Sequence, residues 1–315
     1  MNIIPIVFSF NHFVLTPAGV CINSLLRHSA KYTFYDIYIL HGEGELNYEH
    51  QAHISKLKFY YQNCNFTFLN VGNTLNNVHT LRGIPKVTYY RFLIPRLLPE
   101  FDKIIFSDPD IIYKGDLSDV FLNTDLTEYY LAAVKSAFVY RKYCKSIGCD
   151  PDNYTNGGFQ IYNLKAFREL ELDKKQLEMC GGKYFYLDQD ITNIVCKGKI
   201  LFLSPKYNST QMFFKHSKND SYKNWMEKLY SEKEMNEGLN PIVHHFNGIK
   251  PWNGMCYMYD IYWEEFRNSI FYDEELYFKH NIKMMNPTPG FLLKKFPKSI
   301  LKKYFGTFKS KYIDQ

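Results

Sequence analysis

Two aspartates separated by one residue are the first groups in this chain that could do chemistry. Asp108 and Asp110 flank Pro109 in the run FSDPD. Carboxylates at i and i+2 of an extended backbone point to the same side, and an oxygen-rich pair of this kind suits Mg²⁺ or Mn²⁺. Asp and Pro also form solvated turns. The position directly after the apolar run KIIFS favours a metal site, because ligands of open α/β sheets lie beyond the carboxyl ends of the strands.

A second group of reactive side chains lies in the run VHHFNGIKPW. His244 or His245 can add an imidazole ligand to a carboxylate site. Gly248 allows the backbone to approach a diphosphate closely, and Lys250 supplies a point charge for its oxygens. A single histidine at a strand end would more often be a packed core residue. Because His, Gly and Lys occur together here, we favour a binding role.

Amides and carboxylates gather in two further runs, YTNGGFQIYNL and YLDQDITN. These groups hydrogen-bond sugar hydroxyls bidentately when they lie at the mouth of a sheet. The acids at Asp188 and Asp190 are equally typical of an N-cap and the first turn of a helix. Both functions can hold at once, with one acid capping the helix while its neighbour faces the site.

The order of the apolar runs predicts the elements that must position these residues. Strands are expected at residues 3–10, 34–40, 66–71, 103–107, 130–134, 159–162, 200–203 and 242–246. Helices are expected at residues 16–29, 46–61, 87–97 and 164–179, with another beginning near Asp188. Continuous rather than alternating apolar strands indicate a sheet covered on both faces, hence an α/β fold with parallel strands.

The charge of the chain is unevenly distributed. It has 38 basic and 32 acidic residues for a net charge of +6, yet residues 281–315 carry +7 and the rest −1. A near-neutral body argues against nucleic-acid binding, and the basic, aromatic segment 289–312 reads as an interfacial helix for an anionic membrane surface. A C-terminal helix docked on the body with solvated lysines is the alternative. Seven scattered cysteines without a C-x-x-C pair favour a reducing compartment.

Export and membrane insertion are not expected. No stretch approaches the roughly 20 apolar residues of a spanning helix, and the first residues lack the basic region of a signal peptide. The hydrophobic content of 46% excludes a disordered chain. We therefore expect a protein of a reducing compartment that is neither secreted nor anchored by a spanning helix.

Taken together, FSDPDIIYKGDL, YTNGGFQIYNLKAF, YLDQDITN, PKYNST and VHHFNGIKPW resemble, in this order, glycosyltransferase family 8. The group contains bacterial lipopolysaccharide galactosyl- and glucosyltransferases and the glycogenins. The resemblance runs from residue 6 to about residue 263. It implies a GT-A fold, which is a Rossmann-like, nucleotide-binding mixed sheet flanked by helices, over residues 1–265. The nucleotide-binding half would be about residues 1–115, the donor-sugar and acceptor half residues 116–265, and residues 266–315 a basic C-terminal helical segment.

The resemblance also assigns roles to particular residues. It implies metal ligation by Asp108, Asp110 and His245, with His244 left as the alternative histidine. The residues that it places around the nucleotide, diphosphate and donor are Ser9, Asn11, Phe13, Arg91, Pro109, Gly157, Gly248 and Lys250. Those that it places at the reacting sugar are Asn156, Asp188 and Gln189. The chain departs from the family pattern after its first strand, where an Asp and an Asn usually precede a tyrosine that stacks on uracil and this chain has Asn11, His12 and Phe13. It departs again at Ser136, where an acid is usual.

The implied function is a retaining, metal-dependent hexosyltransferase with Mn²⁺ or Mg²⁺ as cofactor. It would move glucose or galactose from a UDP-sugar to a saccharide acceptor, such as lipopolysaccharide, lipooligosaccharide or another surface glycan. The resemblance also implies a cytoplasmic protein, peripheral on the inner face of a bacterial cytoplasmic membrane. A transferase acting on a protein or on itself, and an inactive sugar-nucleotide-binding homologue, are the alternatives. Since the amide of Gln189 is a poor nucleophile, same-face attack is favoured over a covalent intermediate.

Overall fold

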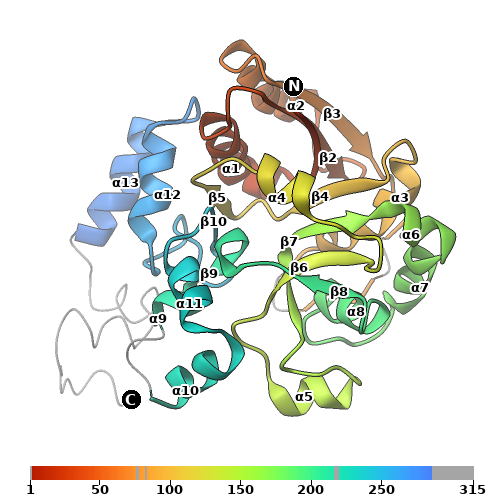
Figure 1. Cartoon of the computed structure of the whole chain (residues 1–315). Helices are drawn as coiled ribbons and strands as arrows, with labels where there is room; N and C mark the ends of the chain where they lie inside the picture. Colours follow the sequence, from red (N-terminus) through yellow and green to blue (C-terminus); the bar gives the residue numbers. More distant parts are fainter. Residues whose placement is uncertain (1, 76–77, 82–83, 216–219, 286–315) are drawn as a thin grey trace.

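A computed structural model describes residues 2–75, 78–81, 84–215 and 220–285. Its centre is a seven-stranded sheet with strand order β3-β2-β1-β4-β7-β6-β8 (Figure 1). The strands are β1 (Asn2–Ser9), β2 (Thr33–His41), β3 (Cys64–Asn70), β4 (Lys103–Ser107), β6 (Leu131–Lys135), β7 (Thr155–Asn163) and β8 (Ile200–Phe202). A three-stranded sheet, ordered β5-β10-β9, begins just beyond the end of β4 and consists of β5 (Ile111–Tyr113), β9 (Ser209–Thr210) and β10 (Val243–His245).

The large sheet is mixed, as the GT-A expectation requires. Strands β1 to β4 run parallel, with β1 between β2 and β4. Strand β7 is antiparallel to both β4 and β6, so the expectation of parallel strands was wrong at this strand. Eight of the nine residues of β7 are buried. The continuous apolar run predicted correctly that both faces of this strand are covered. Burial on both faces does not, however, determine whether a strand runs parallel or antiparallel to its neighbours.

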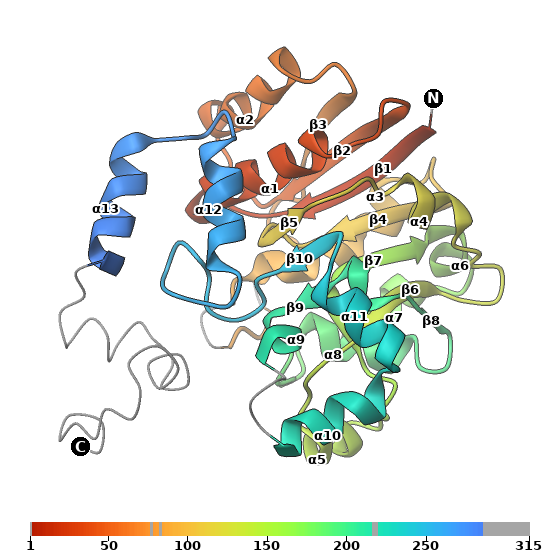
Figure 2. The ribbon, with the colours of Figure 1, turned by 60° about the vertical axis from the view of Figure 1, so that its left-hand side comes forward.

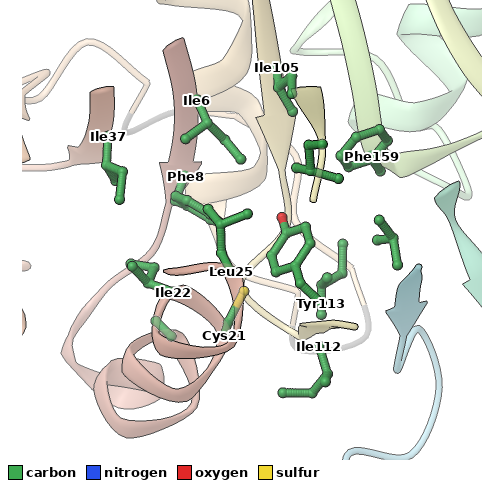
Figure 3. Close-up of a cluster of buried hydrophobic side chains, with 14 of the residues drawn as sticks. Ile6, Phe8, Cys21, Ile22, Leu25, Ile37, Ile105, Ile112, Tyr113 and Phe159 are labelled. Carbon is green, nitrogen blue, oxygen red and sulfur yellow. The ribbon is translucent and has the colours of Figure 1, made fainter. Parts of the chain in front are cut away.

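Both faces of the sheet pack against helices. Along β1, Ile6 and Phe8 point into one apolar cluster, while Val7 points into the other. Figure 3 shows the first cluster, where Cys21 of α1 and Tyr113 of β5 pack beneath the strands. The second cluster is covered by α3, α6, α7 and α8. The carboxyl ends of β1 and β4 are thus held rigidly from both sides.

The helices account for most of the remaining described chain. The α-helices are α1 (Leu15–Arg27), α2 (Tyr48–Ser55), α3 (Ile94–Leu97), α4 (Ser118–Asn123), α5 (Arg141–Ser146), α6 (Leu164–Glu169), α7 (Leu172–Met179), α8 (Asp188–Val195), α9 (Gln211–Lys215), α10 (Asp220–Leu229), α11 (Glu232–Leu239), α12 (Tyr259–Arg267) and α13 (Glu274–Met285). Short 3₁₀ segments are η1 (His12–Val14), η2 (Lys56–Phe59), η3 (Lys86–Leu93) and η4 (Pro205–Tyr207).

Three predicted helices are interrupted. The helix expected at 164–179 ends at Glu169 and restarts at Leu172, because Glu171 adopts a left-handed conformation with φ 52°. The segment 87–97 is mostly the 3₁₀ segment η3, followed by only four α-helical residues. The helix expected at 46–61 becomes 3₁₀ at Lys56. In each case the apolar spacing indicated a helical segment without resolving where it changes type.

Helix α12 is joined to the main body by an ionic cluster around one buried acid. Figures 1 and 2 show α12 and α13 side by side, with α12 next to α1. Glu265 of α12 is fully buried, and its carboxylate accepts hydrogen bonds from Arg27 (3.1 Å) and Lys114 (2.7 Å). His28 lies 3.0 Å from the same carboxylate. Burial alone would raise the pKa of Glu265, but His28 and Lys114 lower it to about 2.

Glu265→Gln should therefore destabilise the protein by about 2 kcal/mol near neutral pH, because hydrogen bonds to a charged partner are lost. Glu264→Gln on the same helix is the matched control, since Glu264 is 53% exposed and should cost less than about 0.5 kcal/mol. A depressed folded pKa stabilises above the unfolded value of about 4.3 and loses that stabilisation as the pH falls to the folded value. Urea unfolding should show the difference between Glu265→Gln and wild type shrinking below about pH 4.3; a difference independent of pH would contradict this assignment.

The predicted membrane-binding segment 289–312 lies outside the described residues and stays a prediction. Within the described ranges, no helix is both long and apolar enough to cross a bilayer.

Candidate functional site

The Asp108–Asp110 turn is fixed by bonds to both sheets. Its start is held by the Asp108 backbone N–H, which donates to the Gly158 carbonyl of β7 (2.8 Å). Its end is held by the Phe246 N–H, which donates to the Asp110 carbonyl (2.9 Å). Pro109 lies between them and is partly exposed. The two carboxylates therefore project at the seam between the large and the small sheet.

His245 completes a three-residue cluster with these aspartates. One potential ligand atom from each of Asp108, Asp110 and His245 lies within 4.8 Å of the others. The Nε2 atom of His245 is 3.3 Å from Asp110 Oδ1 and 3.9 Å from Asp108 Oδ2. Strand β10 is antiparallel to β5, and its pairing of His245 with Ile111 brings the imidazole beside the turn.

His244 points the opposite way on the same strand, as alternation along a strand requires. Its ring packs between Phe246 (4.6 Å between centroids) and Phe214 (5.3 Å). Burial lowers the pKa of His244 to about 3, so the ring is neutral. Neither ring nitrogen has a hydrogen-bond partner within the described part of the chain. Of the two histidines, only His245 lies with the aspartates.

The cluster has the chemistry of a divalent metal site. Two carboxylates and one imidazole form a donor set that suits Mn²⁺ or Mg²⁺. Asp110 Oδ1 is buried and receives no hydrogen bond from any described residue. A buried carboxylate oxygen without a donor is costly unless something positive satisfies it. The residues present therefore fit a bound cation.

Lys250 contributes the other positive charge at Asp110. Its ammonium group bonds Asp110 Oδ2 and also donates to the Phe246 carbonyl (2.7 Å). Burial would raise the pKa of Asp110, but the adjacent ammonium of Lys250 holds it below its usual range. Gly248, in the same loop, is exposed. The loop after β10 thus presents one lysine and an open backbone next to the cluster.

Arg91 joins the aspartate turn to the amide-rich segments. It is only 2% exposed, although arginine is almost never buried without partners. Its guanidinium donates to Asp108 (2.9 Å), to the Gly157 carbonyl (2.7 Å) and, through Nε, to the Thr88 carbonyl (3.0 Å), while Nε also lies 3.1 Å from Asp188 in an ion pair. The same group lies 4.0 Å from the centre of the Phe106 ring. Burial raises the pKa of Asp188 to about 6, with Arg91 opposing that rise.

The amide of Gln189 is held in a defined orientation. Its Oε1 accepts from the Gly157 N–H (3.0 Å) and from Asn156 Nδ2 (3.3 Å). Its Nε2 donates to the Tyr154 hydroxyl (3.3 Å). Each primary amide has two N–H bonds, and within the described residues one of the two is bonded in Gln189 and one in Asn156.

The two acids flanking Gln189 differ in their surroundings. Helix α8 begins after Leu187 without a side-chain cap, so neither acid is the N-cap considered from the sequence. Asp188 faces Arg91. Asp190 is fully buried and accepts hydrogen bonds from the hydroxyls of Tyr143 (2.6 Å) and Tyr154 (2.5 Å) and from the Tyr186 N–H (2.7 Å). Asp190 thus anchors the start of α8.

The residues predicted around the nucleotide follow β1. The hydroxyl of Ser9 donates to the Val87 carbonyl, and Asn11 caps η1 by accepting from the Phe13 N–H (3.1 Å). Phe13 is 81% exposed. Because Phe8 of β1 pairs in register with Ser107 of β4, this segment lies next to the aspartate turn. An exposed ring at this position can stack on a planar base.

Sequence reasoning gave no role to three residues that the structure joins to this group. Asn208 bridges His245 and Asn156. Tyr154 accepts from Gln189 and donates to Asp190. Gly158 packs so closely on His245 that a methyl group at its Cα would overlap the imidazole ring. The paired glycines of NGG were a signal of such close approach, whereas nothing near Asn208 indicated its contact with a histidine 37 residues away.

Comparison with known proteins finds glycosyltransferases among the relatives of this chain. A putative glycosyltransferase of Haemophilus influenzae is 31% identical over 214 residues, covering 65% of this chain and 63% of that protein. A lipopolysaccharide 1,2-glucosyltransferase of Escherichia coli is 29% identical over 175 residues, covering 53% and 49%. The matched stretches thus span about half to two thirds of these curated relatives.

A solved structure shares the fold. The galactosyltransferase LgtC, in complex with donor and acceptor sugar analogs, matches 86% of this chain and 98% of its own with a TM-score of 0.70 at 21% identity. This likeness confirms the predicted GT-A fold. The model of the family described as glycosyl transferase family 8 matches residues 5–256, which include the aspartate turn, the amide segments and His245. The chain therefore belongs to glycosyl transferase family 8.

Proposed function

We propose that this protein is a metal-dependent hexosyltransferase that uses a UDP-hexose as donor and a saccharide of lipopolysaccharide or another surface glycan as acceptor. The observation that carries the proposal is the Asp108–Asp110–His245 cluster beside Lys250, in a member of this family. The acceptor class is supported by the lipopolysaccharide glucosyltransferase among its relatives. Membrane binding through residues 289–312 and a cytoplasmic location remain predictions.

Stabilisation of the leaving diphosphate is the main catalytic effect in this proposal. Asp108, Asp110 and His245 would hold the ion, which supplies positive charge against the charge that develops on UDP. Lys250 lies at the same edge and adds its own positive charge there. Phe13 would stack on the base, with Ser9, Asn11 and Pro109 beside it.

The sugar would be bound on the amide side of the site. The remaining N–H bonds of Asn156 and Gln189 can donate to its hydroxyls. Arg91 holds Asp188 and the Gly157 carbonyl in place around it. Because hydrogen bonds and ion pairs within the protein already hold these side chains in the absence of a ligand, donor binding would require little further ordering of them.

Retention by same-face attack is supported by the state of the nearby carboxylates. Asp188 is paired with Arg91, and Asp190 is buried behind two tyrosine hydroxyls. Gln189 is neutral. A covalent intermediate needs a carboxylate nucleophile that can reach the anomeric carbon. The described residues of α8 offer none in an unpaired state.

A panel of UDP-hexoses tests the proposal directly. We expect Mn²⁺-dependent release of UDP from UDP-glucose or UDP-galactose, abolished by EDTA and much weaker with GDP-mannose. The same donors with Mn²⁺ should raise the melting temperature, because ligands that bind only the folded state stabilise it. Adding truncated lipopolysaccharide core should accelerate UDP release, and NMR of the product should show retained anomeric configuration.

The outcomes separate the proposal from its alternatives. Stabilisation by UDP-hexose without any turnover would indicate an inactive sugar-nucleotide-binding homologue. A mass increase of the protein itself, measured by intact mass spectrometry, would indicate self-glycosylation. Turnover that is unaffected by EDTA would contradict the metal assignment.

A further inference from the structure

Asn208 is the hydrogen-bond partner of both His245 and Asn156. The side chain is 1% exposed and follows η4, directly before β9. Its Oδ1 lies 2.9 Å from His245 Nδ1, and its Nδ2 donates to Asn156 Oδ1 over 2.8 Å. Strand β9 runs parallel to β10, with Thr210 paired to His245, so the backbone itself holds Asn208 near the imidazole.

The direction of every hydrogen bond in this group follows from one backbone N–H. The Gly158 N–H can only donate, and it points to Asn156 Oδ1 at 2.9 Å. The atom of Asn208 that meets the same oxygen must also be a donor, so it is the amide nitrogen. The carbonyl oxygen of Asn208 then faces His245 Nδ1. An oxygen only accepts, so Nδ1 must carry the proton.

A second backbone N–H fixes the hydrogen-bond direction at the Gln189 end of this series. The Gly157 N–H donates to Gln189 Oε1, which makes the Asn156 atom that meets this oxygen a donor as well. Both ends therefore require the same orientation of Asn156. The donor-to-acceptor direction of the hydrogen bonds that link Gln189, Asn156, Asn208 and His245 is therefore determined independently at each end.

We infer that Asn208 is a positioning residue that fixes the neutral imidazole of His245 in its Nδ1–H tautomer, so that the lone pair of the neutral ring is on Nε2. In this tautomer the Nε2 lone pair faces Asp110 Oδ1 at 3.3 Å, an oxygen that receives no hydrogen bond within the described residues. Two acceptors that face each other favour a cation between them. The inference rests on the proposed function, since it explains why the imidazole is ready to act as a ligand, and partners of this type typically affect metal affinity by 10- to 100-fold.

Two variants of Asn208 separate its possible roles. Asn208→Asp keeps an oxygen acceptor for Nδ1–H, whereas Asn208→Leu keeps the approximate size and removes the acceptor. We expect the tautomer and Mn²⁺ affinity of Asn208→Asp to stay close to wild type. In Asn208→Leu, Mn²⁺ binding should weaken by about 10- to 100-fold.

The decisive measurement uses the metal-free, full-length protein without sugar. Long-range ¹H–¹⁵N correlation NMR of histidine-labelled protein at about pH 9, where the unperturbed ring is neutral, distinguishes an Nδ1 proton from an Nε2 proton. Absence of its signals in His245→Asn assigns the ring, and His244, which lacks hydrogen-bond partners within the described part of the chain, is the internal control. Wild type and Asn208→Asp should show Nδ1–H, and Asn208→Leu should show a shift toward Nε2–H, with His244 unchanged.

Each result bears on the inference separately from the proposed function. A proton on Nε2 in wild type overturns the inference, and so does an identical tautomer in Asn208→Asp and Asn208→Leu. If Asn208→Leu does not fold, the wild-type spectrum alone still decides. Because no donor or metal is present, an incorrect donor assignment leaves this measurement unchanged, while Mn²⁺ titration followed by electron paramagnetic resonance tests the metal separately.

Discussion

Asp110→Asn should reduce metal-dependent turnover of the UDP-hexose by about 1000-fold or more. Asp110 is the member of the cluster that lies closest to both His245 and Lys250. Replacing its carboxylate removes a charged ligand, and stabilisation of the leaving-group charge by a metal is worth several kcal/mol, at about 1.4 kcal/mol per tenfold in rate. Steady-state UDP release at saturating donor is the measurement.

The fold should survive this change. Asp110 is 15% exposed and Lys250 is 28% exposed, so the freed ammonium can reach solvent. Circular dichroism and cooperative urea unfolding should therefore resemble wild type. Asp125→Asn is the control, since this exposed carboxylate lies in the loop after α4. Undiminished turnover in Asp110→Asn would refute the metal assignment, and loss of the fold would shift the role of Asp110 to stability.

Arg91→Met should have the largest effect on stability, about 3–5 kcal/mol, which is the usual cost of leaving a buried charge without its partner. The change removes the counter-charge of Asp188 and Asp108 and the donor to the Gly157 carbonyl. Activity should fall with it, because Gly157 and Asp188 lose their common support. Arg141→Met is the matched control, since the Arg141–Asp152 pair is 40% and 38% exposed and should cost less than about 1 kcal/mol.

A second substitution and the pH distinguish lost charge pairing from lost packing. Arg91→Met/Asp188→Asn should recover part of the stability without recovering activity. Asp188 already has a raised pKa, and a folded pKa above the unfolded value means that stability falls as the pH rises through the folded value. The deficit of Arg91→Met should thus be smaller at about pH 5 than at about pH 8. Equal deficits at both pH values, with no recovery in the double variant, would point to packing alone.

The sequence predicted the parts of this molecule in which local pattern and position agree. The strand at residues 103–107 has the predicted bounds, because charged residues limit the apolar run to a length that suits a strand and is short for a helix. The aspartates beyond it lie at the sheet edge, as expected from strand ends. His245 rather than His244 joins them, since alternation along a strand sends neighbours to opposite faces.

Other features depend on contacts that sequence pattern does not encode. Strand β9 has only two residues and offers no periodicity, so the bond between Asn208 and His245 could not be predicted. Leu187, with φ 52° and ψ −123°, has a conformation unusual for a residue with a side chain, and nothing in its identity indicates it. In the sequence, Glu265 cannot be told from an exposed helical acid, because its partners are Arg27, at the end of α1, and Lys114, directly after β5.

The Lys250–Asp110 ion pair has a consequence for the order in which ligands associate. The ammonium of Lys250 on Oδ2 partly neutralises the Asp110 carboxylate, whose Oδ1 would face the cation, and so weakens the attraction of that carboxylate for the cation. Under the proposed function, the diphosphate of the donor would offer Lys250 another anionic partner and so leave the carboxylate to the cation. The binding free energies of the two ligands would then be coupled, and linkage requires such coupling to be reciprocal. Mn²⁺ and UDP should each bind more tightly in the presence of the other, so that this lysine makes the nucleotide and its counter-ion a single cooperative unit.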